Sequence, residues 1–501
     1  MFKLKHLALD TLREHVIVVH EQAVRSGNLG FNPLDRVRVF ALENFSSAPR
    51  EVTGVLNFCR DTLVASDEIG VSEEAFHDLG LAEGSAVGAE LATAPRSVDL
   101  VRAKLNGKRL DKAAFASILA DVARRRYSRV ELSMFVLGCA LRRLELPELV
   151  DFTHAMIEVG EQLNFGPGPV ADKHSIGGIP GNRTTMIIVP ILAALGLTVP
   201  KTSSRAITSP AGTADTMGVL ADVGLSPQRL YDVVRKVGAC IAWGGALQLA
   251  PADDILITVE RPMEIDTEAQ MVASILAKNK TAGATHVALD LPVGRSAKVR
   301  SIAAAERLGA TFRSVADQIG LRVDVVITEA RGPIGRGVGP RLEALDVLAV
   351  LRREPDAPID LREKSLYLAS RIIEMMGAAP VGAGYRAAQQ QLDSGAAQRK
   401  FEEIIAAQGA REFPAPAPFV TAFPSPADGR IKEFDCLEIA RVAKRAGAPA
   451  NITAGLRLLK TVGEIVEQGE PLFEIHAESR SQLEAAKSYA VSHSELVVFG
   501  F

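Results

Sequence analysis

The sequence predicts an α/β fold with several domains, and three observations lead to this fold class. The chain has 501 residues, roughly three domains of ordinary length, and 47% of them are apolar, enough to bury a core in each. Strand-like and helical stretches alternate from about residue 169, which is typical of βαβ units around a mostly parallel sheet. Three prolines in EFPAPAPF (412–419) mark a linker before a separate C-terminal tail.

The N-terminal region predicts a small β-rich domain over residues 1–94. Short strand-like segments are separated there by turns rich in glycine, asparagine and proline: HVIVVH (15–20), DRVRVF (35–40) and TLVAS (62–66). After this region the apolar residues recur with helical spacing, as in KAAFASILADVARR. We therefore expect an α-helical domain over 95–165. A second segment, about 260–284, would belong to the same domain, because it contains the helical stretch EAQMVASILAKNKTAG.

The remaining segments predict an α/β domain over 166–259 and 285–410. Its clearest strands are THVALDLPVG and LRVDVVITEA, which flank a helical stretch over 301–318. The tail over 419–501 contains short strand-like segments with turns at DGR and QGEP. An α+β domain is expected there, with an all-β domain as the alternative.

Composition argues against several kinds of partner. The 57 lysines and arginines balance 60 aspartates and glutamates, for a net charge of −3 without a basic block, which disfavours nucleic acid as a partner. Four scattered cysteines without a CxxC pair, and histidines without metal-ligand spacing, predict neither a disulfide framework nor a metal site. The apolar run over 186–200 is too short to span a bilayer, and no signal peptide is evident, so we expect a cytoplasmic protein without a membrane partner.

The first candidate site is the polar loop DKHSIGGIPGNRTT (172–185), which follows a predicted strand. Loops at the carboxyl ends of parallel strands converge, and the N–H groups of the following helices point toward them. Glycines let backbone amides approach an anion, while a lysine and several hydroxyl groups supply donors: Lys173, Ser175, Gly177, Gly178, Gly181, Thr184 and Thr185. The loop matches neither GxxxxGK[ST] nor GxGxxG, so an ordinary glycine turn remains the alternative.

A second polar loop, KTSSRAITSPAGT (201–213), follows the next predicted strand. Because adjacent strand ends face one crevice, the two loops predict a single anion-binding pocket suited to phosphate. Some of the hydroxyl groups would only cap the following helix. That role does not account for their number, or for Arg205.

Weaker candidates follow along the chain. Asp266 lies near a helix start, where capping is the alternative, and Ser274 and Lys278 lie four residues apart on one helical face that could simply be solvated. The loop PVGRSAKVR (292–300) carries Gly294, Arg295 and Lys298 at another strand end, as a second cationic group or a basic surface loop. The glycine-rich run over 331–344 is interpreted as a tight turn.

Four ordered motifs, DKHSIGGIPGN, SSRAITSPAGTADT, LAPAD and ASILAK, resemble the thymidine/pyrimidine-nucleoside phosphorylase family. The resemblance covers essentially the whole chain and is greatest to the type 2 branch that contains AMP phosphorylase. It implies a homodimer or larger homo-oligomer, in which a helical domain and a phosphate-binding α/β domain close over the substrates.

The resemblance also implies roles for individual residues. Those matching phosphate ligands are Lys173, Ser175, Thr185, Ser203 and Thr213, and His174 matches a histidine beside the base. Ser274 and Lys278 match residues that hold the pyrimidine. In the AMP phosphorylase branch, Asp266 matches the proton donor, and the nucleotide-binding positions are matched by Gly178, Ser204, Arg205, Ala206, Ile207, Thr208, Ser209, Thr213, Ser274 and Lys298.

Two departures bear on the substrate. Thymidine phosphorylases carry a GRGLGHTGGT-like second loop, and SRAITSPAGT lacks its histidine and two of its glycines. The arginine that helps to bind the pyrimidine has no secure counterpart, because Arg261 lies two residues too close to Ser274. Both changes weaken the thymidine assignment specifically.

The implied reaction is phosphorolysis of a pyrimidine nucleoside such as thymidine, with inorganic phosphate as co-substrate and no cofactor. Phosphorolysis of AMP or another nucleoside 5′-monophosphate is the first alternative. A phosphoribosyltransferase of the anthranilate type would need an acidic magnesium-binding cluster beside the loops, which the sequence lacks. A phosphate- or nucleotide-sensing module is the non-enzymatic alternative.

Overall fold

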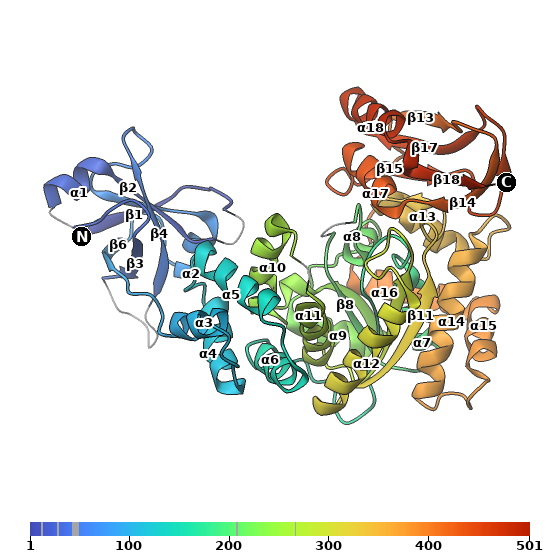
Figure 1. Cartoon of the computed structure of the whole chain (residues 1–501), viewed down its shortest axis with the longest axis horizontal. Helices are drawn as coiled ribbons and strands as arrows, with labels where there is room; N and C mark the ends of the chain where they lie inside the picture. The colour runs from blue at the N-terminus through green and yellow to red at the C-terminus, as the bar shows by residue number, and fades with distance from the viewer. Residues whose placement is uncertain (12–13, 28–29, 43–49, 207–208, 266, 501) are drawn as a thin grey trace. The chain divides into compact units, whose positions relative to one another are not determined.

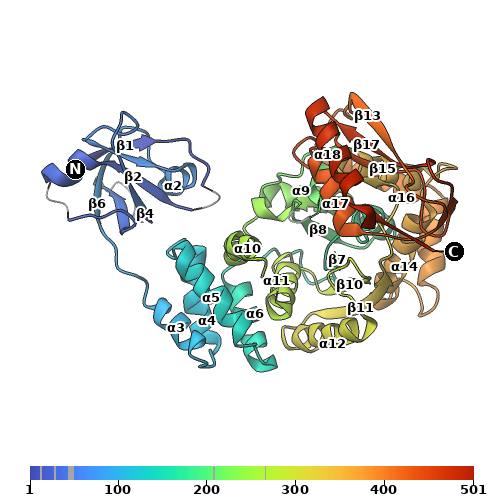
Figure 2. The same ribbon diagram turned by 45° about the horizontal axis from the view of Figure 1, so that its top comes forward.

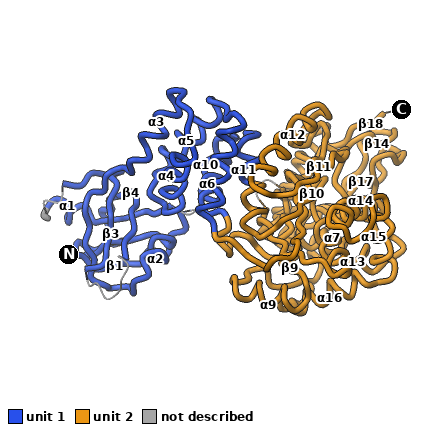
Figure 3. The backbone as a smooth tube through the Cα atoms, turned by 90° about the horizontal axis from the view of Figure 1, so that it is seen from below, with its two compact units in different colours: residues 1–160, 250–274 blue, residues 161–249, 275–501 orange. Residues whose placement is uncertain are grey.

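The computed structural model describes residues 1–501 except 12–13, 28–29, 43–49, 207–208, 266 and 501. The backbone forms two compact units, one of residues 1–160 and 250–274 and the other of residues 161–249 and 275–501 (Figure 3). Helix α11 (Glu268–Thr281) contains one of the boundaries between them.

The first unit begins with a closed six-stranded barrel in the order β1-β5-β2-β4-β3-β6. Alternating apolar residues of its strands fill the interior, among them Ile17, Val37 and Leu56, which are fully buried. The elements are β1 (Phe2–His6), β2 (Val16–His20), α1 (Glu21–Gly27), β3 (Arg36–Ala41), β4 (Glu51–Cys59), β5 (Glu68–Val71), α2 (Glu73–Leu79) and β6 (Ala86–Leu91). The strand expected over 62–66 is wrong, because Leu63 to Ser66 form turns and bends between β4 and β5.

Helices form the rest of the first unit: α3 (Ser97–Leu105), α4 (Lys112–Ala123), α5 (Arg129–Leu141), α6 (Leu146–Glu158), α10 (Pro251–Met263) and the start of α11. Ser128 and Glu131 close a capping box at the start of α5, which satisfies backbone N–H groups there. Three buried aromatic rings, of Phe115, Phe135 and Phe152, meet between α4, α5 and α6.

The second unit is built on parallel strands. Strands β7 (Ala171–Ser175), β10 (His286–Val293) and β11 (Arg322–Glu329) pair in the order β11-β10-β7, and β8 (Val199–Ser203) pairs in parallel with β9 (Ala239–Trp243). A parallel bridge between Val170 and Thr198 connects the two groups. Their carboxyl ends therefore point the same way, and this is where the two polar loops begin.

Helices cover these strands and contribute most of the core. Helix α7 (Thr184–Ala194) is apolar on every side and is buried from Thr184 to Ala193, because α13, α14 and α16 pack against it. Helix α12 (Ile302–Gln318) packs on β11 (Figure 2). The other helices are α8 (Thr213–Gly218), α9 (Pro227–Val237), α13 (Pro340–Arg352), α14 (Ile359–Met375), α15 (Gly384–Asp393) and α16 (Ala396–Gln408).

The chain ends in antiparallel strands with two helices, drawn orange to red in Figure 1. Its elements are β13 (Phe419–Pro424), β14 (Gly429–Phe434), α17 (Cys436–Arg445), β15 (Gly455–Leu458), β16 (Ile465–Val466), β17 (Pro471–Ala477), α18 (Arg480–Ser492) and β18 (Val497–Gly500). Strand β12 (Gly337–Val338) joins the sheet of these strands by pairing with β15. Ile179 of the first polar loop and Val338 are buried in the C-terminal core.

The expected α/β class with several domains is confirmed. No helix in the described part of the chain is both long and apolar enough to cross a membrane.

Candidate active site

The first polar loop begins later in the chain than its predicted start at Asp172. Lys173, His174 and Ser175 belong to strand β7 itself and pair in register with Ala288, Leu289 and Asp290 of β10. The expectation that they lie in a loop after the strand is therefore wrong. Because side chains alternate along a strand, Lys173 and Ser175 leave one face of the sheet and His174 leaves the other.

Lys173 is buried and makes specific contacts at the start of α7. Its ammonium donates to Thr184 Oγ1 at 2.8 Å and lies 3.5 Å from the Gly181 carbonyl oxygen and 4.0 Å from Asp290 Oδ2. Burial lowers the pKa of Lys173 to about 8, while the Asp290 carboxylate opposes this shift and the charge of Lys364 adds to it. Near pH 7 the ammonium is therefore still mostly charged, and a bound anion would favour that charged form further.

The partners of Lys173 include residues that the sequence analysis did not single out. Asp290 is fully buried on β10, and its Oδ1 accepts a hydrogen bond from Thr328 Oγ1 at 2.6 Å. Lys364 of α14 donates to the Pro180 carbonyl at 2.9 Å and lies 3.2 Å from Asp290 Oδ2. The aspartate inside the apolar strand HVALDLPV could have indicated this part of the site from the sequence, because a buried carboxylate needs a cationic or hydrogen-bonding partner. No local pattern marks Lys364, which the packing of α14 brings to the site.

Ser175, the last residue of β7, carries an unsatisfied hydroxyl group. Its hydroxyl oxygen is buried and finds no hydrogen-bond partner among the described residues, although buried polar atoms are normally satisfied. Gly181 makes this position possible, since a Cβ there would lie 2.4 Å from Ser175 Oγ. Thr185, which also matches a phosphate ligand, is buried in the first turn of α7. Lys173, Ser175 and the start of α7 are thus assembled around one small region.

His174 lies in a strongly cationic environment. Burial moves its pKa well below 6.5, and the charges of four lysines lower it further: Lys201, Lys173, Lys278 and Lys298. Its imidazole is therefore neutral near pH 7. Asn279 Nδ2 donates to the Ile275 carbonyl and lies 3.4 Å from His174 Nδ1, which favours the tautomer that carries its proton on Nε2.

The second polar loop is held by Asp215. Its Oδ2 accepts from the backbone N–H groups of Ala206, at 2.6 Å, and Gly212, at 2.9 Å. Ser209 Oγ donates to the Ala211 carbonyl, and that carbonyl also accepts from Asn182 Nδ2 of the first loop at 2.9 Å. The two loops are therefore in direct contact.

The remaining residues of the second loop differ in exposure. Ser204 and Arg205 are exposed, and the Arg205 guanidinium lies over the Trp243 ring at 4.7 Å. Ser203 ends β8, and Thr213 begins α8. Lys201 is buried in an ion pair with Asp172 at 2.8 Å, so its charge balances a carboxylate.

The two cations of the loop after β10 have different neighbours. Arg295 forms ion pairs with Glu433 at 3.2 Å and Asp435 at 3.3 Å, so it anchors the loop to the C-terminal strands. Lys298 lies beside the first polar loop, where a Cβ at Gly177 would be 3.9 Å from its Cε. Of these two cations, Lys298 is therefore the one that lies close to the first loop.

Three of the expected site residues, Asp266, Ile207 and Thr208, lie outside the described residues. Ser274 belongs to the first unit, whereas Lys278, on the same helix, belongs to the second. Gly178 lies in the first loop with a positive φ of 92°.

Comparisons with known proteins identify the relatives of this chain. Residues 167–398 match the model described as "Glycosyl transferase family, a/b domain", and residues 430–496 match "Pyrimidine nucleoside phosphorylase C-terminal domain". The chain is 46% identical to a Polaromonas sp. protein over 99% of this chain and 96% of that one, and 46% identical to a Ralstonia nicotianae protein over 98% and 95%. Both are named "Putative thymidine phosphorylase". The chain belongs to the thymidine/pyrimidine-nucleoside phosphorylase family.

One solved structure has a fold similar to part of this phosphorylase-family chain. Anthranilate phosphoribosyltransferase from Thermus thermophilus superposes with a TM-score of 0.53 at 20% identity, and covers 62% of this chain and 99% of its own. At that identity the likeness concerns the fold alone.

Proposed function

We propose that this chain is a pentosyltransferase that catalyses reversible phosphorolysis of a pyrimidine nucleoside such as thymidine, giving the free base and a (deoxy)ribose 1-phosphate. The observation that carries the proposal is the buried, unpartnered Ser175 hydroxyl on the strand that also carries the buried Lys173. Four oxygens of a phosphate ion would satisfy donors of this kind. Relatives 46% identical along nearly the whole chain carry a thymidine phosphorylase name, which supports the same reaction.

The reaction needs the nucleophile to be positioned more than activated. A phosphate oxygen forms a bond to C1′ of the sugar while the C1′–N bond breaks, and the base leaves with that electron pair. Positive charge develops on the sugar, where the bound phosphate offsets it. Lys173, Ser175 and Thr185 would orient the phosphate, with Ser203 and Thr213 reaching it from the second loop.

The departing base needs a hydrogen bond or a proton. His174 is neutral, so it would donate a hydrogen bond from Nε2–H rather than act as an imidazolium acid. Asp266 is the proposed proton donor for a nucleotide substrate, and His174 the proposed donor to thymidine. Lys278 and Ser274 are proposed to hold the pyrimidine.

A nucleoside 5′-monophosphate such as AMP is the second candidate substrate, with ribose 1,5-bisphosphate as the product. The placement of Lys298 beside the first loop favours it, as does an exposed Arg205 in a second loop that lacks the thymidine-type histidine. These two cations would bind the 5′-phosphate. Gly178 and the run from Ser204 to Ser209 would line the same part of the site.

A substrate panel tests the proposal. Purified protein is incubated with thymidine, uridine, AMP, CMP or UMP, with and without inorganic phosphate, and the released base is measured. Phosphate-dependent release from the nucleosides supports the first proposal, and release from the nucleotides alone supports the second. Phosphate binding without release of any base would indicate a sensing module instead.

We also propose that the enzyme works in the cytoplasm as a homodimer or larger homo-oligomer, without a cofactor or metal. Light scattering coupled to size-exclusion chromatography measures the assembly, and activity after treatment with a chelator tests the metal. The four-domain layout with boundaries near 95, 166 and 419 remains part of this proposal. Limited proteolysis followed by mass spectrometry would cut at those boundaries first.

A further inference from the structure

Arg183 occupies an unusual position at the start of α7. Its side chain is fully buried. Its backbone has a left-handed φ of 57°, which residues other than glycine rarely adopt. The residue directly precedes Thr184, which binds Lys173, and Thr185. A strained conformation next to a binding site persists only when its surroundings hold it firmly.

Two carboxylates hold the Arg183 guanidinium. Asp346 Oδ2 accepts from Nη1 at 2.7 Å, and Glu343 Oε1 lies 3.2 Å from Nη2. Both carboxylates come from α13 and are buried. Burial raises the pKa of each, and the Arg183 charge opposes that shift, so the cation keeps both groups ionised more readily.

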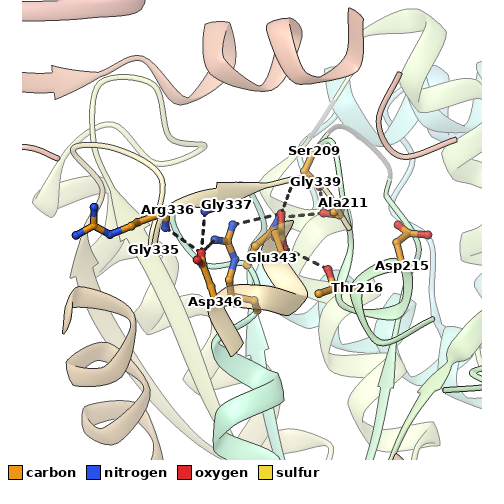
Figure 4. Close-up of polar contacts among 12 residues, drawn as sticks. Ser209, Ala211, Asp215, Thr216, Gly335, Arg336, Gly337, Gly339, Glu343 and Asp346 are labelled. Atoms are coloured by element: carbon orange, nitrogen blue, oxygen red, sulfur yellow. Dashed lines mark hydrogen bonds and ion pairs between the residues drawn. The ribbon is translucent and has the colours of Figure 1, made fainter. Parts of the chain in front are cut away.

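The same carboxylates bind other segments of the site. Asp346 accepts from the backbone N–H groups of Arg336, at 2.9 Å, and Gly337, at 2.8 Å, in the run that the sequence analysis interpreted as a tight turn. Figure 4 shows these residues gathered around the Asp346 carboxylate, with Thr216 pointing toward Glu343. Gly335 is needed there, because a Cβ would lie 2.5 Å from Asp346 Oδ2.

Glu343 contacts helix α8 and the first polar loop. It accepts from Thr216 Oγ1 of α8 at 3.3 Å, and it lies 3.5 Å from Asn182 Nδ2 of the first loop. Asn182 also donates to the Ala211 carbonyl of the second loop at 2.9 Å. One ionic cluster therefore contacts the first loop, the start of α8 and the glycine-rich turn at once.

We propose that Arg183 is a positioning residue that sets the spacing between the two polar loops, so that one phosphate ion can bind donors from both. The proposal rests on the proposed phosphorolysis, whose phosphate site it deepens. Arg183 acts through its neighbours and does not itself contact the phosphate. The glycine-rich turn serves as the support for this cluster, and not merely as a turn.

The competing explanation is that the cluster only stabilises the fold. The helical part of the first unit offers a matched control, because Lys104 and Glu148 form an equally buried ion pair at 2.5 Å that lies on other helices. Glu148→Gln should therefore reproduce the loss of stability without touching the polar loops. Asn182→Ala removes the direct contact between the loops and keeps the ion pairs.

The experiment compares wild type with Arg183→Lys, Asn182→Ala and Glu148→Gln. Melting temperature, the Kd for inorganic phosphate from calorimetry, and kcat and KM for both substrates are measured. Lysine cannot hold two carboxylates with a planar fork, so Arg183→Lys is expected to raise the phosphate Kd about tenfold, and Asn182→Ala by a similar factor. In both variants the KM for phosphate should rise more than kcat falls, while Glu148→Gln leaves the phosphate Kd unchanged.

An unchanged phosphate Kd in Arg183→Lys, with a melting temperature lowered as in Glu148→Gln, would overturn the proposal. If Arg183→Lys does not fold, Asn182→Ala decides, and an unchanged phosphate Kd in that variant has the same consequence. A wild-type protein that binds phosphate but releases no base would refute the proposed function only. The series of phosphate Kd values would still test the role of Arg183.

Discussion

The Lys364 ammonium lies 3.2 Å from Asp290 Oδ2, an oxygen that accepts no hydrogen bond from the described residues. The same oxygen lies 4.0 Å from the Lys173 ammonium. One buried carboxylate thus lies close to two lysine ammonium groups. The arrangement holds Lys173 at the site and leaves a net positive charge, which an incoming phosphate would balance.

Phosphate affinity should depend on the charge of Lys173. Its pKa in the folded protein is about 8, below the ordinary 10.5, so phosphate binding is expected to weaken above pH 8 by about tenfold per pH unit. In the unfolded chain the lysine stays protonated up to the higher value, so its contribution to folding becomes more favourable as pH rises from 8 to 10.5. Calorimetry with inorganic phosphate between pH 7 and 10 measures the affinity.

Replacing Lys364 extends this prediction. Lys364→Met removes a charge that lowers the Lys173 pKa, so the break in the phosphate affinity profile should move to higher pH. At pH 7 affinity should fall, because the first loop loses the contact to the Pro180 carbonyl. Lys400→Met, which removes a lysine paired with Glu403 on α16, serves as the control. A break that stays at pH 8 would show that Lys364 does not act on Lys173.

His174 is expected to act as a neutral hydrogen-bond donor. Its pKa lies well below 6.5, so the stability that it contributes is present above pH 6.5 and is lost as pH falls below that value. The difference in unfolding free energy between wild type and His174→Ala should therefore shrink from pH 7 to pH 5. On thymidine, kcat should fall about 100-fold in the variant. A histidine resonance that titrates near 6.5 by NMR and disappears in the variant would contradict this prediction.

Gly181 should be the most sensitive glycine of the first loop. A Cβ there would lie 2.4 Å from Ser175 Oγ and 3.3 Å from Asp290 Oδ2, so Gly181→Ala displaces the hydroxyl that is proposed to bind phosphate. We expect the phosphate Kd to rise at least about tenfold. Gly168→Ala, where a Cβ meets no atom within 4 Å, should bind phosphate as wild type does. Equal Kd values for the two variants would exclude the proposed place of Ser175.

The sequence predicted much of the fold, because local patterns carry it. The strand THVALDLPVG and the helix over 301–318 match β10 and α12 within a residue or two, since apolar runs and the Ser301 cap are local signals. The strand predicted at TLVAS was wrong for the opposite reason. Its few apolar residues lie in turns between two barrel strands, and only the closure of the barrel determines where those strands end.

The residues of the candidate site likewise fall into those that local patterns predicted and those that they did not. Lys173 and Ser175 could be named because they adjoin a glycine-rich segment after a strand. Lys364 and Asp346 come from helices whose sequences look like ordinary amphipathic surfaces, and only tertiary packing brings them to the loops. Arg295 was interpreted either as part of a second cationic group for the substrate or as part of a basic surface loop, and it pairs with Glu433, which lies 138 residues later in the chain.

Trp243, the single tryptophan of the chain, provides a signal for the substrate preference of the second loop. The Arg205 guanidinium lies 4.7 Å from its ring, so an anion that draws Arg205 away should change the tryptophan fluorescence. If the second loop binds a 5′-phosphate, AMP or UMP should change this fluorescence more than uridine does. Arg205→Ala should raise the KM for the nucleotide about 10- to 100-fold relative to that for the nucleoside, since a charged hydrogen bond is lost. Arg235→Ala, which removes an exposed arginine of α9 beside Asp232, should leave that ratio unchanged. A ratio unaffected by Arg205→Ala would place the 5′-phosphate elsewhere and favour the nucleoside as substrate.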